Sequence, residues 1–349
     1  MQPAVICVPA RDERSEIPSL IRTVAAQEAD APIRLVLLAN HCRDGTAERA
    51  RELAAAEPRL QLRLLEVEFP SHEAHAGSAR RAAVQAGADW LCELGAHETG
   101  VVLSTDADAR LPPGWLIANL RALASGAEVV GGRIEAEDTS SNPLPAAIRG
   151  MASHIGAYWQ AVRALSDSID PLPHDPPPRH GDHTGASLAV ALPWLRAVGG
   201  VPPLRSREDV ALVEALEWAG ARLRHAPDVW VEVSARQHGR AEGGMAAEMR
   251  RWATAPADAY HLPAASHWLR LARTRRAIRD GFHSGRLPDL AGYLGLEAAS
   301  LTRIAAESPN DIACVARVCR LLPTGTAAQQ EMVAAMREMR ALAEPERVA

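Results

Sequence analysis

The sequence of 349 residues contains no lysine. All of its 38 Lys or Arg residues are arginines. This absence excludes a P-loop lysine, a lysine Schiff base and a lysine general base. Arginine binds phosphate in a planar, bidentate way, so phosphate chemistry stays open. Aromatic residues are also scarce, at 4% of the chain, and alanine and aliphatic side chains must therefore build most of the core.

Charge and cysteine usage narrow the class of protein further. The net charge is −5 and no basic stripe is interleaved with aromatics, which argues against nucleic-acid binding. The five cysteines form no CxxC pair, so neither a disulfide framework nor a structural zinc site is expected, and a reducing compartment is favoured. There is no signal-peptide pattern and no run of 18 apolar residues, so we expect a cytoplasmic protein without a transmembrane segment.

The first 135 residues alternate between short apolar runs and stretches with helical spacing, which predicts strands and helices in turn. The expected strands cover 4–8, 33–39, 60–67, 101–104 and 129–135, and the expected helices cover 15–27, 44–56, 77–94 and 112–123. Such alternation predicts an α/β fold, with a mostly parallel central sheet flanked by helices.

The remainder of the chain changes character near residue 240. Before that point we expect helices at 143–165, 193–198 and 207–219, a loop at 166–184, and strands at 185–191, 222–226 and 229–233. After residue 244 the pattern is helical, at 245–255, 265–282, 296–307, 310–321 and 326–343. We therefore place a domain boundary near 240–260, followed by a C-terminal helical extension.

Ligands of mostly parallel sheets bind outside the carboxyl ends of the strands. Polar segments follow three of the expected strands directly, at 9–13, 39–44 and 106–108. We therefore expect these three segments to meet in one site.

Asp106 and Asp108 lie one residue apart at such a strand end, where their carboxylates can converge on one cation. Hard carboxylate oxygens suit Mg²⁺ or Mn²⁺, which takes substrate phosphates as further ligands. The alternative is a solvated pair of carboxylates in a turn. Because Asp106 and Asp108 follow a buried parallel strand, the sequence supports the metal site and the solvated pair equally.

Two further segments bear on phosphate binding. Residues 9–13 lack the glycines of GxGxxG, which disfavours a Rossmann-type NAD site. Gly77 opens an expected helix with Arg80 and Arg81 in its first turns, and free backbone N–H groups backed by arginine can hold a phosphate or carboxylate. A helix with a solvated basic face is the equal alternative.

Acidic and histidine residues in the second half suggest two more functional segments. Glu208 and Asp209 begin an expected helix, where acidic residues are common for structural reasons, but where a general base could also point into a cleft. The loop 166–184 carries His174, His180 and His183 among aspartates and prolines. It could bind a metal, but its proline content favours an acceptor-side lid.

In order and spacing, these segments resemble the family 2 glycosyltransferases of the GT-A fold. The matching segments are VICVPARDE at 5–13, ANHCRDGT at 39–46, GSARR at 77–81, DAD at 106–108, LPPGWL at 111–116, GASLA at 185–189, VGG at 198–200 and ED at 208–209. The resemblance covers about residues 4–240, and its strength lies in the order of many short motifs.

The resemblance implies the GT-A, or nucleotide-diphospho-sugar transferase, fold over 1–240, with a nucleotide half at 1–110 and an acceptor half at 111–240. Residues 241–349 would form a helical extension, and this extension could mediate oligomerisation. It implies an enzyme that moves a sugar from a nucleotide-diphosphate donor to an unknown acceptor hydroxyl, on a small molecule or on a lipid or glycan. Mg²⁺ or Mn²⁺ would neutralise the leaving nucleoside diphosphate as a Lewis acid.

The resemblance also implies roles for individual residues. Asp209 would be the general base, with Glu208 beside it in the catalytic pair, and Asp108 the direct metal ligand, with Asp106 contacting metal and ribose. The donor-binding residues would be Pro9, Ala10, Arg11, Glu13, Asn40, Gly77, Arg80, Asp106, Arg236 and Arg240. The acceptor-side residues would be His183, Gly185 and Ala186.

This sequence departs from the family pattern in two places. Ala39 and Asn40 stand where the family has an acidic pair that often reads the base edge, which leaves the donor base open, although Asn40 can still donate and accept. After the last expected strand, Arg236 and Arg240 are predicted to bind the diphosphate. His238 is a candidate third metal ligand, with an ordinary surface histidine as the alternative.

Two other function classes stay under consideration. A sugar nucleotidyltransferase would need a Gly-rich, Lys-bearing loop after the first strand, which is absent. A non-catalytic sugar-nucleotide-binding or scaffolding protein would not need Asp106, Asp108 and Asp209, which are all present. A base at position 209 predicts inversion at the sugar, although both stereochemical outcomes occur on this fold.

Overall fold

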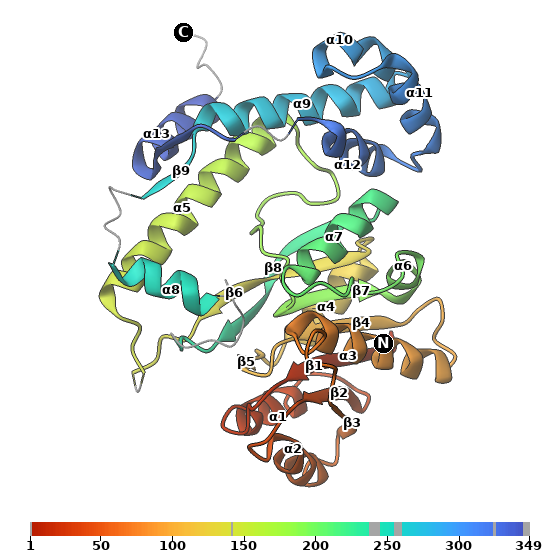
Figure 1. Ribbon diagram of the computed structural model, residues 1–349, viewed down its shortest axis with the longest axis vertical. Coiled ribbons are helices and arrows are strands. Elements are labelled where there is room, and N and C mark those ends of the chain that lie inside the picture. Colours follow the sequence, from red (N-terminus) through yellow and green to blue (C-terminus); the bar gives the residue numbers. More distant parts are fainter. Residues whose placement is uncertain (1, 141, 237–244, 255–259, 324–325, 345–349) are drawn as a thin grey trace.

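The structure is a computed structural model that describes residues 2–140, 142–236, 245–254, 260–323 and 326–344. At the centre of this described part lies an eight-stranded sheet with the order β3-β2-β1-β4-β7-β6-β8-β5 (Figure 1). Its strands are β1 (Ala4–Ala10), β2 (Ile33–Asn40), β3 (Leu60–Val67), β4 (Val101–Thr105), β5 (Ala109–Arg110), β6 (Val129–Ala136), β7 (Ser187–Ala191) and β8 (Leu223–Val233). Within this sheet only β7 and β5 run against their neighbours, so the predicted α/β fold with a mostly parallel sheet is confirmed.

Helices cover both faces of the sheet, and side chains alternate between the two resulting cores. In β1, Ile6 and Val8 enter one core, whereas Val5 and Cys7 enter the other. The first core is covered by α1 (Ile17–Ala25), α2 (Thr46–Ala55) and α4 (Trp115–Ala124), and the second by α3 (Ala76–Glu93), α6 (Leu192–Ala197) and α7 (Glu208–Ala219). A strand buried on both faces needs apolar residues at nearly every position, which explains the continuous apolar runs in the sequence.

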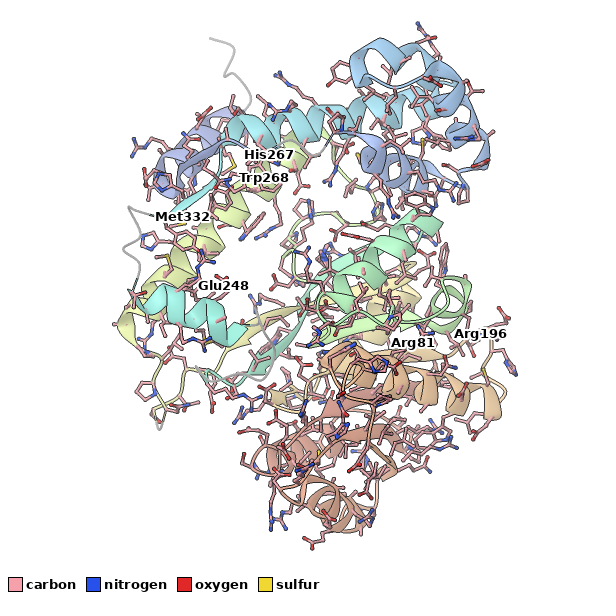
Figure 2. All side chains as sticks on the ribbon, in the orientation of Figure 1. Arg81, Arg196, Glu248, His267, Trp268 and Met332 are labelled. Carbon is pink, nitrogen blue, oxygen red and sulfur yellow. The ribbon has the colours of Figure 1, made fainter. Side chains whose placement is uncertain are left out.

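A second group of helices packs around the long helix α5 (Ala146–Ile169). α9 (Ala265–His283) and α13 (Met332–Ala343) share an apolar cluster with α5 (Figure 1). Trp268 and Met332 lie at this junction (Figure 2). The Trp268 indole donates to the Tyr158 hydroxyl over 2.6 Å, and that hydroxyl donates to the Pro263 carbonyl over 2.6 Å.

The C-terminal end of α9 takes part in a second, smaller apolar cluster, which lies beside the helices of the sheet domain. It is formed with η2 (Leu287–Leu290), α10 (Ala291–Leu294), α11 (Ala298–Glu307) and α12 (Asp311–Leu321). Asn310 donates to the Gly220 carbonyl over 2.7 Å, and Arg317 donates to the Trp218 carbonyl over 3.2 Å. The C-terminal helices are therefore attached to the end of α7.

The predicted elements differ from the structure where chain pairing overrides local pattern. The two strands expected at 222–226 and 229–233 are the single strand β8, whose register with β6 shifts beyond Gly131, so that Pro227 falls in an irregular stretch. Proline cannot donate to a sheet ladder, which explains the irregularity. The helix expected from 326 begins only at Met332, because β10 (Gln329–Glu331) pairs with β9 (His261–Pro263).

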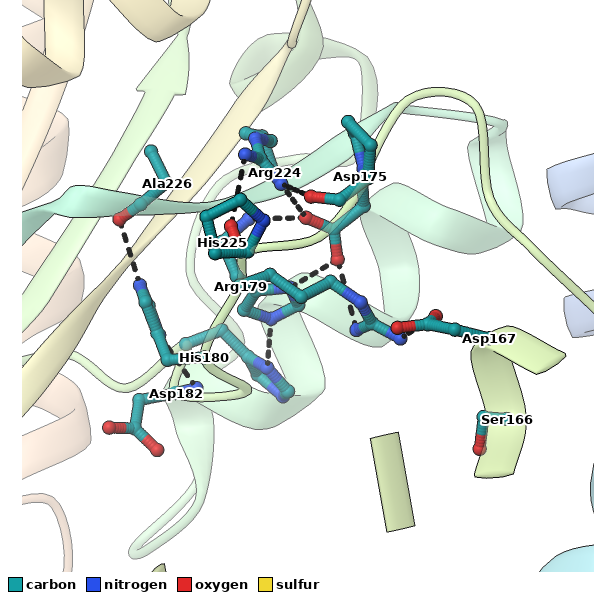
Figure 3. Close-up of polar contacts among 12 residues, drawn as sticks. Ser166, Asp167, Asp175, Arg179, His180, Asp182, Arg224, His225 and Ala226 are labelled. Carbon is teal, nitrogen blue, oxygen red and sulfur yellow. Dashed lines mark hydrogen bonds and ion pairs between the residues drawn. The ribbon is translucent and has the colours of Figure 1, made fainter. Parts of the chain in front are cut away.

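The loop after α5 is attached more firmly than the lid that its proline content predicts. α5 continues to Ile169, so the loop begins at Asp170, whose carboxylate accepts from Arg279 over 3.0 Å. Arg179 binds Asp167 over 2.8 Å. These ion pairs hold the loop against α9 and α5, and Figure 3 shows the pair of Arg179 and Asp167.

α8 (Met245–Thr254) packs against α5 through Met249 and Ile148. The domain boundary predicted near 240–260 stays a prediction, and residues 237–244 and 255–259 lie outside the described part. None of the helices in the described ranges is both long enough and apolar enough to cross a membrane.

Candidate active site

Arg80 on α3 is the centre of a buried polar network at the carboxyl end of β4. Its Nε donates to Glu208 over 2.9 Å, and its Nη2 donates to Asp106 over 2.8 Å. Its Nη1 donates to the Ser104 hydroxyl over 2.7 Å and to the Gly185 carbonyl over 2.9 Å. Arg80 therefore ties β4, the start of β7 and the start of α7 together.

The electrostatics of Arg80 follow from its two carboxylate partners. Burial alone would lower the pKa of Arg80, but the charges of Asp106 and Glu208 outweigh that effect and raise the pKa above its usual value. Arg80 thus stays charged in the interior. Four of the five N–H donors of Arg80 are hydrogen-bonded within the protein. Arg80 is therefore better suited to orienting Asp106 than to binding a donor phosphate, the role that the family resemblance implies.

Gly185 connects Arg80 to Asp209. Its carbonyl accepts from Arg80, and its N–H donates to Asp209 Oδ2 over 2.6 Å. A Cβ atom at this position would lie 2.3 Å from the Arg80 guanidinium carbon. Only glycine lets the chain pass this close to Arg80, so the GASLA segment has a packing requirement at its first residue.

Asp108, Glu13 and Arg236 form a second charged group beside the first. Arg236 donates to the two Glu13 oxygens over 2.7 Å each, and its Nη2 lies 3.0 Å from Asp108 Oδ2. Burial, and then the charges of Asp106, Glu13 and Glu16, raise the pKa of Asp108 to about 7, while Arg236 opposes the shift. Burial is thus the largest cause of the shift, and the neighbouring carboxylates add to it.

The chemistry of these donors fits a divalent cation. Asp106 and Asp108 offer oxygen atoms, which Mg²⁺ and Mn²⁺ prefer. The pKa of Asp108 is raised first by burial and then by the neighbouring carboxylates, and a bound cation would favour the ionised form. Among the described residues, no three His, Cys, Asp or Glu side chains are grouped to hold a metal by themselves. A cation at Asp108 would therefore take its remaining ligands from water or from a diphosphate.

Asp209 lies in the first turn of α7 and faces the Gly185 loop. Its Oδ2 accepts from Gly185 N over 2.6 Å and its Oδ1 from Val210 N over 2.8 Å. A carboxylate oxygen has a second lone pair, so each oxygen can still accept from a hydroxyl. Asp209 thus has the chemistry of a general base and also anchors the loop.

Glu208 lies elsewhere than the sequence suggests for the neighbour of a base. Its carboxylate is buried, at 5% exposure, against Arg80. A helix places successive residues about 100° apart, so the side chains at 208 and 209 leave α7 in different directions.

The predicted donor-side residues occupy the ends of β1 and β2, with the start of α3 beside them. Pro9 and Ala10 end β1, and Asn40 ends β2 with its side-chain oxygen buried and without a hydrogen-bond partner in the structure. Arg11 is exposed and donates to the Ala74 carbonyl over 3.3 Å. A Cβ atom at Gly77 would lie 1.8 Å from the Leu204 carbonyl oxygen, so this glycine serves a close backbone contact instead of an open anion cradle.

The remaining predicted residues divide into two groups. Ala186 is buried beside Gly185, and Thr105 donates to its carbonyl over 2.7 Å, while His183 is half-buried two residues before Gly185. His238 and Arg240 lie outside the described residues.

Sequence reasoning missed Ser104, although this serine links Arg80 to Gly185. Its hydroxyl accepts from Arg80 and donates to the Gly185 carbonyl over 3.0 Å. The available signal was a hydroxyl residue inside the apolar run before Asp106, where a fully buried strand would otherwise be aliphatic.

Several solved structures are similar to this chain at low sequence identity. The complex of S. aureus TarS 1–349 with UDP-GlcNAc is 14% identical, with a TM-score of 0.49, and the match covers 91% of this chain and 90% of that one. The mannosyltransferase PcManGT from Pyrobaculum calidifontis, in complex with GDP-Man and Mn²⁺, is 18% identical, with a TM-score of 0.45 and coverage of 92% and 87%. Mycobacterium tuberculosis glucosyl-3-phosphoglycerate synthase is 15% identical, with a TM-score of 0.39 and coverage of 72% and 78%.

No curated protein matches the sequence. Residues 5–170, however, match the family model described as Glycosyl transferase family 2. The matched segment runs from β1 through α5 and includes Glu13, Arg80, Asp106 and Asp108. The family and the enzyme class that the sequence predicts are thereby confirmed for this segment.

Proposed function

We propose that this chain, whose residues 5–170 belong to glycosyl transferase family 2, transfers a sugar from a nucleoside-diphosphate donor to an acceptor hydroxyl. The observation that carries the proposal is the grouping of Asp106 and Asp108 around Arg80 and Arg236 at the carboxyl ends of the parallel strands. This is the place where such sheets bind ligands, and Arg80, Asp106 and Asp108 lie within the family segment.

The donor is proposed to bind along the ends of β1, β2 and β4. Pro9 and Ala10 would border the nucleoside, with Asn40 beside them at the end of β2. Arg236 is the arginine best suited to the diphosphate, because its ion pair with Glu13 is only partly buried, with 32% of the Arg236 side chain exposed. Arginine gives bidentate hydrogen bonds to phosphate.

Mg²⁺ or Mn²⁺ is proposed to bind at Asp108, with Asp106 beside it. When bound, the cation would neutralise charge on the leaving nucleoside diphosphate. Arg80 would hold Asp106 in place through their 2.8 Å hydrogen bond. Support for this role is the oxygen donor set, together with the raised pKa of Asp108, to which burial contributes most and the neighbouring carboxylates add.

Asp209 is proposed as the general base for inverting transfer. It would take the proton of the acceptor hydroxyl as the acceptor oxygen forms a bond to the anomeric carbon. The bond from that carbon to the diphosphate oxygen would break at the same time, and the nucleoside diphosphate would leave with the electron pair. The Gly185 N–H would hold the Asp209 carboxylate in place.

The first experiment is a thermal-shift screen of nucleoside diphosphates, with and without Mn²⁺. Ligands that bind only the folded protein raise its melting temperature, so the preferred base should give the largest metal-dependent increase. Failure of all nucleoside diphosphates to stabilise the protein would contradict the proposal.

A second experiment separates the rival classes. Slow, metal-dependent hydrolysis of the preferred nucleotide sugar without acceptor is expected of a glycosyltransferase. A scaffolding protein would bind the nucleotide sugar without turnover. A nucleotidyltransferase would instead form a nucleotide sugar from a sugar phosphate and a nucleoside triphosphate.

A further inference from the structure

Asp108 has an arginine as its counter-ion, at the carboxylate where the cation is proposed to bind. Arg236 Nη2 lies 3.0 Å from Asp108 Oδ2, and within the described ranges Arg236 is the only basic side chain that pairs with Asp108. The guanidinium of Arg80 is directed instead at Asp106 and Glu208. The two aspartates at this strand end are thus neutralised by different arginines.

Glu13 fixes the position of the Arg236 guanidinium. Its carboxylate accepts two hydrogen bonds of 2.7 Å, one from each terminal nitrogen of Arg236, which is the bidentate geometry of strong arginine–carboxylate pairs. Glu13 is only 7% exposed. Its backbone N–H donates to the Thr46 hydroxyl over 2.9 Å, and its carbonyl accepts from the Ile17 N–H over 3.1 Å. The carboxylate that holds Arg236 therefore belongs to a segment that is itself held firmly.

Sheet pairing brings the backbone near Arg236 to Asp108. Ala109 of β5 pairs with Val233 of β8, and the Ser234 N–H donates to the Asp108 carbonyl over 3.3 Å. Both contacts are made by the backbone, so neither depends on the guanidinium. The Arg236 side chain is 32% exposed. The Arg236 guanidinium can therefore leave Asp108 without a change in the sheet.

The guanidinium and a divalent cation compete for Asp108 when no donor is bound. Both are attracted by the same carboxylate, and two cations on one carboxylate repel each other. A diphosphate changes this balance, because its oxygens can bind the cation and can also accept bidentate hydrogen bonds from arginine. Cation and diphosphate should then each favour the binding of the other.

We propose that Arg236 is an exchangeable counter-ion, which neutralises Asp108 in the donor-free protein and moves to the diphosphate when donor and cation bind. Glu13 is the positioning residue that holds Arg236 in the donor-free arrangement. The protein would therefore bind the cation weakly by itself and strongly together with a nucleoside diphosphate. This inference rests on the proposed function and deepens it, because it explains how the same site disfavours a lone cation.

The first test measures Mn²⁺ binding to the full chain without nucleotide, by electron paramagnetic resonance of free Mn²⁺. Arg236→Met should bind Mn²⁺ roughly tenfold more tightly than the natural protein, the effect of one lost charge-assisted hydrogen bond. The matched control is Arg110→Met, because Arg110 pairs with Glu16 and Glu137, at 3.6 and 3.5 Å, and not with Asp108. It removes the same charge two positions along the chain, and should change the affinity by less than about threefold, as for weak ion pairs.

A gain in affinity that is confined to Arg236→Met supports the proposal, and adding Asp108→Asn should abolish this gain. Binding by Arg236→Met that is absent, or no tighter than in the natural protein, would overturn the proposal. Equal gains in Arg236→Met and Arg110→Met would also overturn it, because they would show an effect of net charge alone. Arg236→Gln is a second variant that should show the same gain, and circular dichroism checks that each variant is folded.

The second test repeats the Mn²⁺ titrations with UDP and with GDP. The nucleoside diphosphate that binds should raise the Mn²⁺ affinity of the natural protein by a larger factor than that of Arg236→Met. Only the natural protein has a competing guanidinium that the diphosphate can draw away from Asp108. An equal factor in the two proteins would refute the exchange.

The two proposals fail in different ways. If no nucleoside diphosphate stabilises the protein, the proposed function fails, whatever the Mn²⁺ titrations without nucleotide show. If a nucleoside diphosphate stabilises the natural protein but Arg236→Met gains no Mn²⁺ affinity, only the counter-ion role of Arg236 fails.

Discussion

Removing the charge of Arg80 should destabilise the protein strongly, because one of its ion pairs is fully buried. The Arg80 and Glu208 side chains are 9% and 7% exposed at an N–O distance of 2.9 Å. Breaking a buried pair by removing one partner costs about 3–5 kcal/mol, since the other charge stays buried without compensation. Asp106 is 37% exposed, so its lost partner adds only the ~0–1 kcal/mol of a surface pair.

The perturbation is Arg80→Met, which keeps most of the side-chain length and removes the charge. Urea unfolding followed by tryptophan fluorescence should show a loss of about 3–5 kcal/mol in the free energy of unfolding. The double variant Arg80→Met with Glu208→Leu should be less destabilised than Arg80→Met alone, because no buried charge is left unpaired. Arg121→Met is the control, since Arg121 and Asp228 are 68% and 51% exposed.

Two results would refute this reasoning. One is an Arg80→Met protein within about 1 kcal/mol of the natural protein, the range of exposed pairs such as Arg121–Asp228. The other is a double variant as unstable as the single one, which would mean that the uncompensated Glu208 charge is not the source of the cost.

The other predictions concern the metal, the base, the loop and acid stability. Asp108→Asn should abolish Mn²⁺-dependent stabilisation by nucleoside diphosphates in thermal-shift assays while leaving the fold intact, and retained stabilisation would contradict the metal assignment. Asp209→Asn should lower turnover by ~10²–10⁴-fold, the usual range for a lost general base, with donor affinity little changed; near-full turnover would exclude Asp209 as the base. Gly185→Ala should lower the melting temperature, because a Cβ atom would lie 2.3 Å from the Arg80 guanidinium carbon, and an unchanged melting temperature would argue against that close contact. Burial opposes the ionisation of Asp175, but its hydrogen bonds with His225 (Figure 3) and the charge of Arg179 depress its pKa in the folded state. The stability that its ionised carboxylate contributes is therefore complete above the ordinary carboxyl pKa of about 4 and is lost as pH falls below that value. In urea unfolding measured at a series of acid pH values, Asp175→Asn should therefore lose less stability with falling pH than the natural protein. Identical acid profiles of the two proteins would refute this prediction.

The sequence alone determined that strands and helices alternate, and that polar residues directly follow certain strands. Buried parallel strands must be apolar at nearly every position, as β2 is, so a short apolar run in the sequence is enough to predict such a strand. The same holds for Asp106 and Asp108, because they directly follow such a strand. A local pattern predicts these features since each depends on a few neighbouring residues.

Only the tertiary structure decided which partners these residues have. Arg80 and Glu208 are 128 positions apart, and Asp175 and His225 are 50 positions apart. No local pattern records that α7 begins beside α3, or that β8 passes the loop after α5. The burial of Glu208 against Arg80 and the single strand β8 likewise follow from packing and sheet pairing between distant segments, which override local preference.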